Sequence, residues 1–174
     1  EHEIDDPISD LQNNTVSTLN LIRYGIEKSA ERILYASSMS VYGDVPDKPI
    51  AEDHPCTPLS CYGVGKLAAE NYLRVYQRLL PYVALRMFNV YGPGQSLNNP
   101  YTGILSIFST RIRQRLNLSV FEDGLESRDF VFISDITKAI MLSIEQNAAN
   151  NNLFNVGSGQ QTSILKISKL LVDA

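Results

Sequence analysis

Residues 32–43 read RILYASSMSVYG, and this stretch decides the fold. Its first six residues form a short run of strand-forming side chains, which predicts a buried strand. The strand runs into the hydroxyl side chains of Ser37, Ser38 and Ser40. Polar groups just past the carboxyl end of a parallel strand lie where α/β sheets bind their ligands. The stretch therefore predicts a parallel sheet with a functional site at that edge.

Helical and strand patterns alternate along the rest of the chain. Apolar spacing predicts helices over 11–26, 59–80, 103–116 and 134–148, the last of them capped by Ser134, and a final helix opened by Ser163. Strand candidates lie at 82–86, 118–121, 129–133 and 153–156. Residues 43–58 and 89–100 are rich in Gly, Pro and Asn and are expected to be loops. This alternation predicts an α/β fold with a mostly parallel sheet.

Composition narrows the class of function. The chain has 174 residues, of which 44% are hydrophobic, so it is long and apolar enough for a real core. Its net charge of −4 argues against general nucleic-acid binding, which needs a basic face. No apolar run approaches a membrane span. Two cysteines and two distant histidines make no zinc pattern, so no metal is expected, and free thiols suit a cytoplasmic location.

Tyr62 and Lys66 form the sharpest local pattern, within the segment YGVGK at the start of a predicted helix. Positions i and i+4 share one helix face, so the phenol and the ammonium point the same way. A nearby ammonium favours phenolate and is expected to lower the tyrosine pKa toward the range of an acid/base catalyst. Taken alone, the pair also suits an ordinary surface helix.

Further motifs surround this pair, in order along the chain. They are SSMSVYG at 37–43, LRMFNVYGPG at 85–94, ESRDF at 126–130 and NVGSG at 155–159. Together with YGVGK they resemble the extended short-chain dehydrogenase/reductases, and within them the UDP- and dTDP-sugar 4-epimerases. The resemblance covers essentially the whole chain.

The resemblance implies a partial Rossmann-type doubly wound sheet, with part of a small substrate-binding subdomain. Residues 1–90 would be the C-terminal part of the NAD-binding domain. Residues 91–174 would be a mixed substrate-binding region with the last Rossmann elements, truncated at the carboxyl end. The implied activity is NAD-dependent epimerisation at C4 of a nucleotide-diphosphate hexose through a 4-keto intermediate. The implied assembly is a homodimer that pairs the helices at 11–26 and 59–80.

The resemblance also assigns roles residue by residue. Tyr62 would be the catalytic base, Lys66 would hold the nicotinamide ribose, and Ser38 would hydrogen-bond the reacting sugar oxygen. The cofactor set is Tyr62, Lys66, Ser37, Phe88 and Asn14, and the substrate set is Ser38, Ser40, Asn89, Tyr101 and Arg128. Ser37 and Ser40 equally suit loop hydrogen-bonding roles, Asp129 suits a turn or cap, and Arg86 suits a structural ion pair.

Two departures from the family pattern shape the alternatives. Met39 and Ser40 stand where the sugar dehydratases carry an acid, which favours an epimerase or a 4-ketosugar reductase over a dehydratase. No Gly-x-x-Gly-x-x-Gly loop follows a strand near the amino terminus, although such a loop normally receives the cofactor pyrophosphate. We therefore expect this chain, taken by itself, to bind NAD poorly. A catalytically silent fragment or a protein-binding module remains the non-enzymatic alternative.

Overall fold

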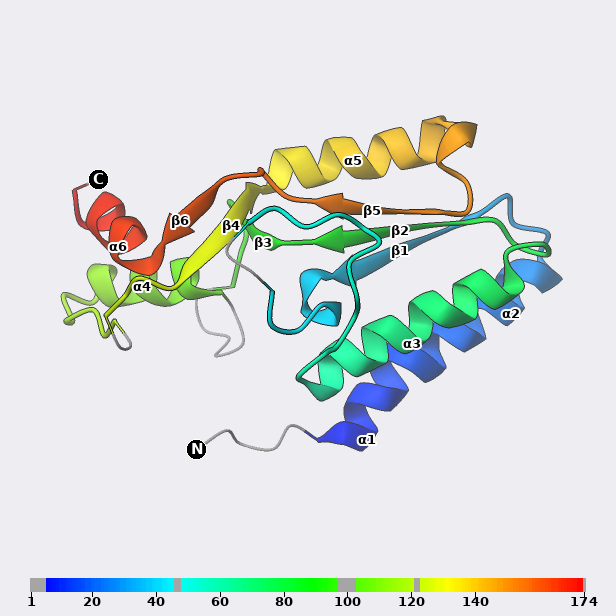
Figure 1. Cartoon of the computed structure of the whole chain (residues 1–174), viewed down its shortest axis with the longest axis horizontal. Helices are drawn as coiled ribbons and strands as arrows, with labels where there is room; N and C mark the ends of the chain where they lie inside the picture. Colours follow the sequence, from blue (N-terminus) through cyan, green and yellow to red (C-terminus); the bar gives the residue numbers. More distant parts are fainter. Residues whose placement is uncertain (1–5, 46–47, 97–102, 121–122, 174) are drawn as a thin grey trace. The chain divides into compact units, whose positions relative to one another are not determined.

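The computed structural model describes residues 6–45, 48–96, 103–120 and 123–173 (Figure 1). They divide into two compact units, Glu1–Met87 with Lys138–Val156, and Phe88–Thr137 with Gly157–Ala174. Within the described ranges, no helix is long and apolar enough to cross a membrane.

A parallel three-stranded sheet forms the centre of the first unit. Its strands are β1 (Ile33–Ser38), β2 (Tyr82–Met87) and β5 (Asn152–Val156), in the order β1-β2-β5. Ser37 pairs with Arg86, and Arg86 pairs with Asn155, so these three residues form one row across the sheet. The row lies close to the carboxyl ends of the strands, the edge where the sequence places the site.

Helices cover both faces of this sheet (Figure 1). One face carries α1 (Pro7–Asp10), the π-helix η1 (Leu11–Val16), α2 (Ser17–Glu27) and α3 (Cys61–Tyr76), and the other carries α5 (Ile133–Glu145). Short 3-10 turns lie at Met39–Val41 (η2) and Asn147–Ala149 (η3). Strand alternation explains the two cores, because Tyr82 and Ala84 pack toward Ile22 and Leu73, whereas the intervening β2 residues pack toward α5.

The second unit is built on a mixed sheet. Its strands are β3 (Asn89–Tyr91), β4 (Ser127–Phe132) and β6 (Gln161–Ser163), with β3 parallel and β6 antiparallel to β4. Its helices are α4 (Ile104–Arg113), with Phe108 buried, and α6 (Ile164–Val172). The Ser163 hydroxyl accepts a hydrogen bond from the Lys166 amide at 3.2 Å, as expected for the cap of the final helix.

The predicted α/β class and parallel sheet are confirmed, three local predictions are wrong, and one strand was not predicted. Residues 89–91 form a strand because they pair with β4, a long-range contact that a Gly- and Pro-rich composition does not reveal. Residues 118–120 have no ladder partner and form no strand. Ser134 lies inside α5 and is not its cap, since the helix follows β4 directly from Ile133. Strand β6 is an addition that the sequence patterns do not predict.

Candidate active site

Helix α3 presents Tyr62, Lys66 and Glu70 at intervals of four residues, so all three lie on one helix face. The Ser60 hydroxyl starts the helix by accepting a hydrogen bond from the Gly63 amide at 3.0 Å. Because this cap fixes the first turn, it also fixes the position of Tyr62 at the amino end of α3.

Two positions of the YGVGK segment, Gly63 and Gly65, need glycine because neighbouring atoms leave little room for a side chain. A Cβ atom at Gly63 would lie 2.6 Å from the Ser40 carbonyl oxygen, and one at Gly65 would lie 3.2 Å from the Cβ of Asn14. The two glycines therefore let the first turns of α3 approach the Ser38–Ser40 turn and the π-helix η1. The close approach at Gly63 brings Tyr62 beside Ser38.

Ser38 is oriented by its neighbour in η2. Its hydroxyl oxygen accepts hydrogen bonds from the Ser40 amide at 3.2 Å and from the Ser40 hydroxyl at 3.0 Å. With both acceptor positions filled, its own proton is available to donate toward Tyr62, and this interaction lowers the pKa of Tyr62. The Ser40 side chain thus supports Ser38, as its loop interpretation anticipated.

Lys66 is held by a carbonyl and two aromatic rings. Its Nζ donates a hydrogen bond to the Ala36 carbonyl oxygen at 2.9 Å. It also lies 5.1 Å from the centre of the Tyr35 ring and 5.4 Å from that of Tyr62. Both distances fall within the range of cation–π attraction.

The pKa of Tyr62 is raised, whereas the sequence pattern predicts that the neighbouring ammonium lowers it. Burial raises the pKa of the phenol above its ordinary value, the Ser38 hydrogen bond lowers it in part, and the Asp10 carboxylate raises it. Burial also lowers the pKa of the Lys66 ammonium. The physical reason is geometric, because the ammonium sits against the Tyr62 ring and hydrogen-bonds Ala36. A further positive charge is needed to lower the pKa of Tyr62 into the range in which the phenol can act as a base.

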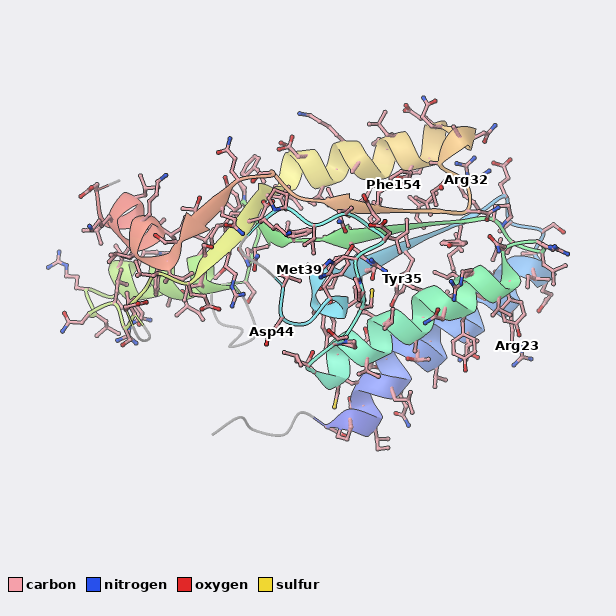
Figure 2. The ribbon with its side chains drawn as sticks, in the orientation of Figure 1. Arg23, Arg32, Tyr35, Met39, Asp44 and Phe154 are labelled. Atoms are coloured by element: carbon pink, nitrogen blue, oxygen red, sulfur yellow. The ribbon has the colours of Figure 1, made fainter. Side chains whose placement is uncertain are left out.

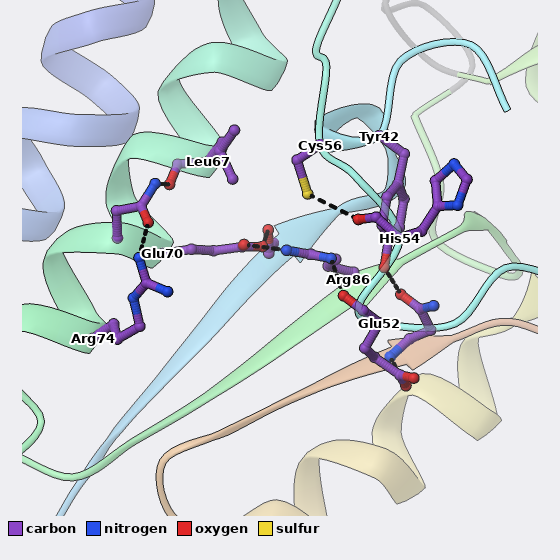
Figure 3. Close-up of polar contacts among 11 residues, drawn as sticks. Tyr42, Glu52, His54, Cys56, Leu67, Glu70, Arg74 and Arg86 are labelled. Carbon is purple, nitrogen blue, oxygen red and sulfur yellow. Dashed lines mark hydrogen bonds and ion pairs between the residues drawn. The ribbon is translucent and has the colours of Figure 1, made fainter.

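A buried polar network lies beneath the site (Figure 3). Glu70 accepts hydrogen bonds from Arg86 Nε at 3.0 Å and Nη2 at 2.7 Å, and from the Ser37 hydroxyl at 2.5 Å. Arg86 also donates to the Glu52 carbonyl oxygen at 3.1 Å and lies 4.6 Å from the centre of the Tyr42 ring. The Ser37 hydroxyl is buried in this network and donates to the Glu70 carboxylate, while its contact with the cofactor stays a prediction.

The network also holds Tyr42 and Glu52, two residues that lie between Ser38 and Tyr62 in the sequence. The Tyr42 hydroxyl donates to Asn155 Oδ1 at 2.7 Å, and the Asn155 amide donates to Glu52 Oε1 at 2.8 Å. Tyr42 and Glu52 are therefore tied to β2 and β5 (Figure 3). The interpretation of Arg86 as a structural ion-pair residue is confirmed, whereas sequence reasoning missed Glu70. The signal for Glu70 was its spacing of eight residues from Tyr62 on the same helix face.

Asn14 lies in the π-helix η1, opposite Gly65. Its Nδ2 donates to the Asp10 backbone oxygen at 3.2 Å and to Asp10 Oδ1 at 3.3 Å. The next residue, Thr15, donates its hydroxyl to the Gly65 carbonyl oxygen at 3.1 Å. Asn14 therefore stands beside the helix turn that bears Lys66, and π-helical segments of this kind are frequent at functional sites.

The other predicted residues belong to the second unit. Asn89 and Arg128 line one hollow of about 250 Å³, together with Ile104, Ser119, Gly124, Glu126 and Ile164. Asn89 Nδ2 donates to the Asp129 carbonyl oxygen at 3.1 Å, and Arg128 Nη2 pairs with Glu126 at 2.5 Å. Tyr101 lies outside the described residues.

Phe88 and Asp129 flank the segment Gly157–Ser158–Gly159. A Cβ atom at Gly157 would lie 3.3 Å from the Phe88 ring and 2.6 Å from Asp129 Oδ2. The Asp129 carboxylate accepts hydrogen bonds from the amides of Ser158 and Gly159, both at 2.8 Å. The turn-stabilising interpretation of Asp129 is confirmed.

Comparison with known proteins relates the chain to one family of enzymes. The profile of the NAD dependent epimerase/dehydratase family matches residues 1–157. A putative UDP-glucose 4-epimerase from Methanocaldococcus jannaschii is 32% identical over 173 residues, covering 98% of this chain and 55% of the relative. The chain thus spans about half the length of the curated relative it matches.

Solved structures give the same result. The crystal structure of UDP-glucose 4-epimerase from Thermotoga maritima with UDP-glucose matches with a TM-score of 0.92 at 31% identity, covering 98% of this chain and 55% of that one. The Thermus thermophilus UDP-glucose 4-epimerase complex with NAD matches with a TM-score of 0.86 at 30% identity, covering 98% and 56%.

Proposed function

The chain belongs to the NAD dependent epimerase/dehydratase family, and we propose from this premise that the whole protein epimerises C4 of a nucleotide-diphosphate hexose. The reaction would pass through a 4-keto sugar with NAD as the cofactor. One observation carries the proposal: α3 and the end of β1 bring Tyr62, Lys66 and Ser38 together, with Lys66 against the Tyr62 ring and Ser38 close enough to lower the pKa of Tyr62.

Tyr62 is the proposed base. Its phenolate takes the proton of the sugar 4-hydroxyl and returns it when the ketone is reduced. Ser38 donates a hydrogen bond to the same sugar oxygen, using the proton that its contacts with Ser40 leave available. NAD held by Lys66 would supply the hydride acceptor and donor for C4, and its positive charge would favour the Tyr62 phenolate.

The residues present suit a nicotinamide ribose. An ammonium has three N–H donors, and Lys66 makes one hydrogen bond among the described residues, to Ala36. Two donors therefore remain for the ribose hydroxyls. Asn14, beside the turn that bears Lys66, completes the proposed ribose contact on the first unit. Phe88 is proposed separately as a residue that contacts the nicotinamide ring.

The hollow that contains Asn89 and Arg128 is the proposed site for the diphosphate of the substrate. A guanidinium pairs with phosphate through two hydrogen bonds, and its present partner, Glu126, is exposed and easily exchanged. In this proposal the first unit binds the cofactor and performs the chemistry, and the second binds the nucleotide sugar.

A homodimer and a cytoplasmic location complete the proposal. Helix α3 exposes a stripe of apolar side chains at Val64, Tyr72 and Val75, continued by Leu79 just after the helix, and α2 exposes Leu21 and Tyr24. Side chains spaced in this way form one helix face, which suits pairing with a second copy. Cys56 and Cys61 are both free thiols, as is usual in a reducing compartment.

The test uses the purified full-length protein. Denaturation should release about one NAD per subunit, because an epimerase regenerates its cofactor in every turnover and has no need to exchange it. Incubation with UDP- or dTDP-hexoses should interconvert the C4 epimers without net consumption of NAD. Stoichiometric oxidation of added NAD(P)H by a 4-keto sugar nucleotide, without epimer formation, would instead identify a reductase.

A further inference from the structure

Tyr35 lies between β1 and α3 in the first unit, a position labelled in Figure 2. Its ring packs against the apolar cluster formed around Ile22, Leu73 and Leu80, and its hydroxyl is buried. Burial raises the pKa of this phenol further above its ordinary value. Tyr35 therefore stays neutral at any working pH and cannot exchange protons with a substrate.

The Tyr35 ring instead faces Lys66. The Nζ of Lys66 lies 5.1 Å from the centre of this ring and also donates a hydrogen bond to the carbonyl oxygen of the next residue of β1, Ala36. The titratable groups around this ammonium are the phenols of Tyr35 and Tyr62 and the Glu70 carboxylate one turn further along α3. Glu70 is already bound to Arg86 and Ser37, so the Tyr35 ring is the side chain that faces the ammonium most closely, besides its backbone partner Ala36.

We propose that Tyr35 is a positioning residue for Lys66: its ring face holds the ammonium in its charged form and in place beside Tyr62. Tyr62 cannot perform this task alone, because its side chain is 39% exposed and belongs to the reacting surface. Tyr35 is anchored in the core and so provides a rigid wall. The inference rests on the proposed function, since it gives Lys66 a role in tuning Tyr62.

The experiment compares two substitutions in the full-length protein. Tyr35→Phe keeps the ring and removes the hydroxyl, whereas Tyr35→Leu keeps an apolar side chain and removes the ring. The pKa of Lys66 is measured from the pH dependence of its acetylation by acetic anhydride, read by mass spectrometry, which needs no turnover. The pH profile of kcat and the midpoint of urea unfolding are measured on the same preparations.

Tyr35→Phe should leave the Lys66 pKa and the kcat profile unchanged within about 0.2 units. Tyr35→Leu should lower the Lys66 pKa by about 0.5–1.5 units, because the ammonium loses its cation–π partner while staying buried. The ammonium then loses its charge at a lower pH. Because the charged Lys66 is needed beside Tyr62, the alkaline limb of the kcat profile should move to lower pH by a similar amount, about 0.5–1.5 units.

Two results would overturn the inference. One is a Tyr35→Leu protein whose unfolding midpoint drops while the Lys66 pKa and the kcat profile stay at wild-type values, which is a purely structural role. The other is an equal effect of Tyr35→Phe, which would assign the role to the hydroxyl. If Tyr35→Leu does not fold, Tyr35→Met gives the same comparison. A wild-type protein without epimerase turnover would refute the proposed function, while the Lys66 pKa would still decide this inference.

Discussion

Glu70 and Arg86 meet through both carboxylate oxygens and two guanidinium nitrogens, so helix α3 is joined to strand β2 by a two-point ion pair. Both side chains are only 6% exposed. Burial lowers the pKa of Arg86, but its contacts with Glu70 and Tyr42 outweigh this and raise the pKa further above its ordinary value, so the guanidinium stays charged at every pH of interest. The active-site helix is therefore fastened to the sheet by charge in the interior.

Breaking this pair from one side should destabilise the first unit strongly. Glu70→Gln or Arg86→Met leaves its partner buried without a counter-charge, and such changes cost about 3–5 kcal/mol. Urea unfolding monitored by circular dichroism measures the loss. Glu27→Gln is the matched control, because the exposed Glu27–Lys28 pair should contribute at most about 1 kcal/mol. Equal effects at the two sites would contradict the buried-pair account.

Tyr62→Phe should abolish epimerisation while leaving the fold intact. The phenol oxygen is the proposed proton carrier, and an acid/base group of this kind contributes about 10²–10⁴-fold in rate. Turnover of the nucleotide sugar is the measurement. Tyr72→Phe is a close control, since Tyr72 lies on the same helix and is 40% exposed, against 39% for Tyr62. Retention of more than about half the wild-type rate in Tyr62→Phe would remove Tyr62 from the mechanism.

Ser38→Ala should have a smaller effect that depends on pH. The Ser38 hydrogen bond lowers the pKa of Tyr62, so its removal raises that pKa further above the ordinary value. A base is active when deprotonated, and the acid limb of the kcat profile should therefore move to higher pH. The rate should fall most at low pH and recover in part as the pH increases. A uniform loss at all pH values would show that Ser38 acts only on the substrate.

Arg128→Ala should weaken binding of the nucleotide sugar. Loss of a charge-assisted contact worth about 1.5–3 kcal/mol predicts a KM or Kd higher by roughly 10–150-fold, with the NAD content unchanged. Titration calorimetry with UDP or dTDP measures this directly. Glu126→Gln should tighten binding slightly, since it frees the guanidinium from its exposed partner. Arg113→Ala, at the exposed end of α4, is the control and should leave affinity unchanged.

Val75→Asp should separate the proposed homodimer. Val75 is 73% exposed in the middle of the apolar stripe of α3, so a carboxylate there would be buried between two copies. Light scattering of the full-length protein at micromolar concentration should report a dimer for wild type and a monomer for Val75→Asp. Leu170→Asp, on exposed α6 of the second unit, should stay dimeric. A monomeric wild-type protein would refute the assembly.

The sequence predicts the parallel sheet and the Tyr62–Lys66 pair because each depends on a local signal, and the family resemblance adds Ser38 to this pair. The strand 33–38 ends in hydroxyls, and the i, i+4 spacing fixes one helix face. It does not predict strand β3, whose existence depends on pairing with distant residues around Phe130, nor the burial of Ser37 against Glu70. The sequence also does not predict the direction of the Tyr62 pKa shift, because desolvation of the phenol depends on how closely η2 and α3 pack.

The contacts of Arg86 with Tyr42 and with the Glu52 backbone divide the connection between Ser38 and Tyr62 into separately closed segments. Closing a longer loop between fixed ends adds only about 0.6 kcal/mol for each doubling of its length. Insertions or deletions between these two anchors should therefore be tolerated while Ser38 and Tyr62 keep their separation. In evolutionary terms, the length between these two anchors is free to change while the chemistry on either side keeps its geometry.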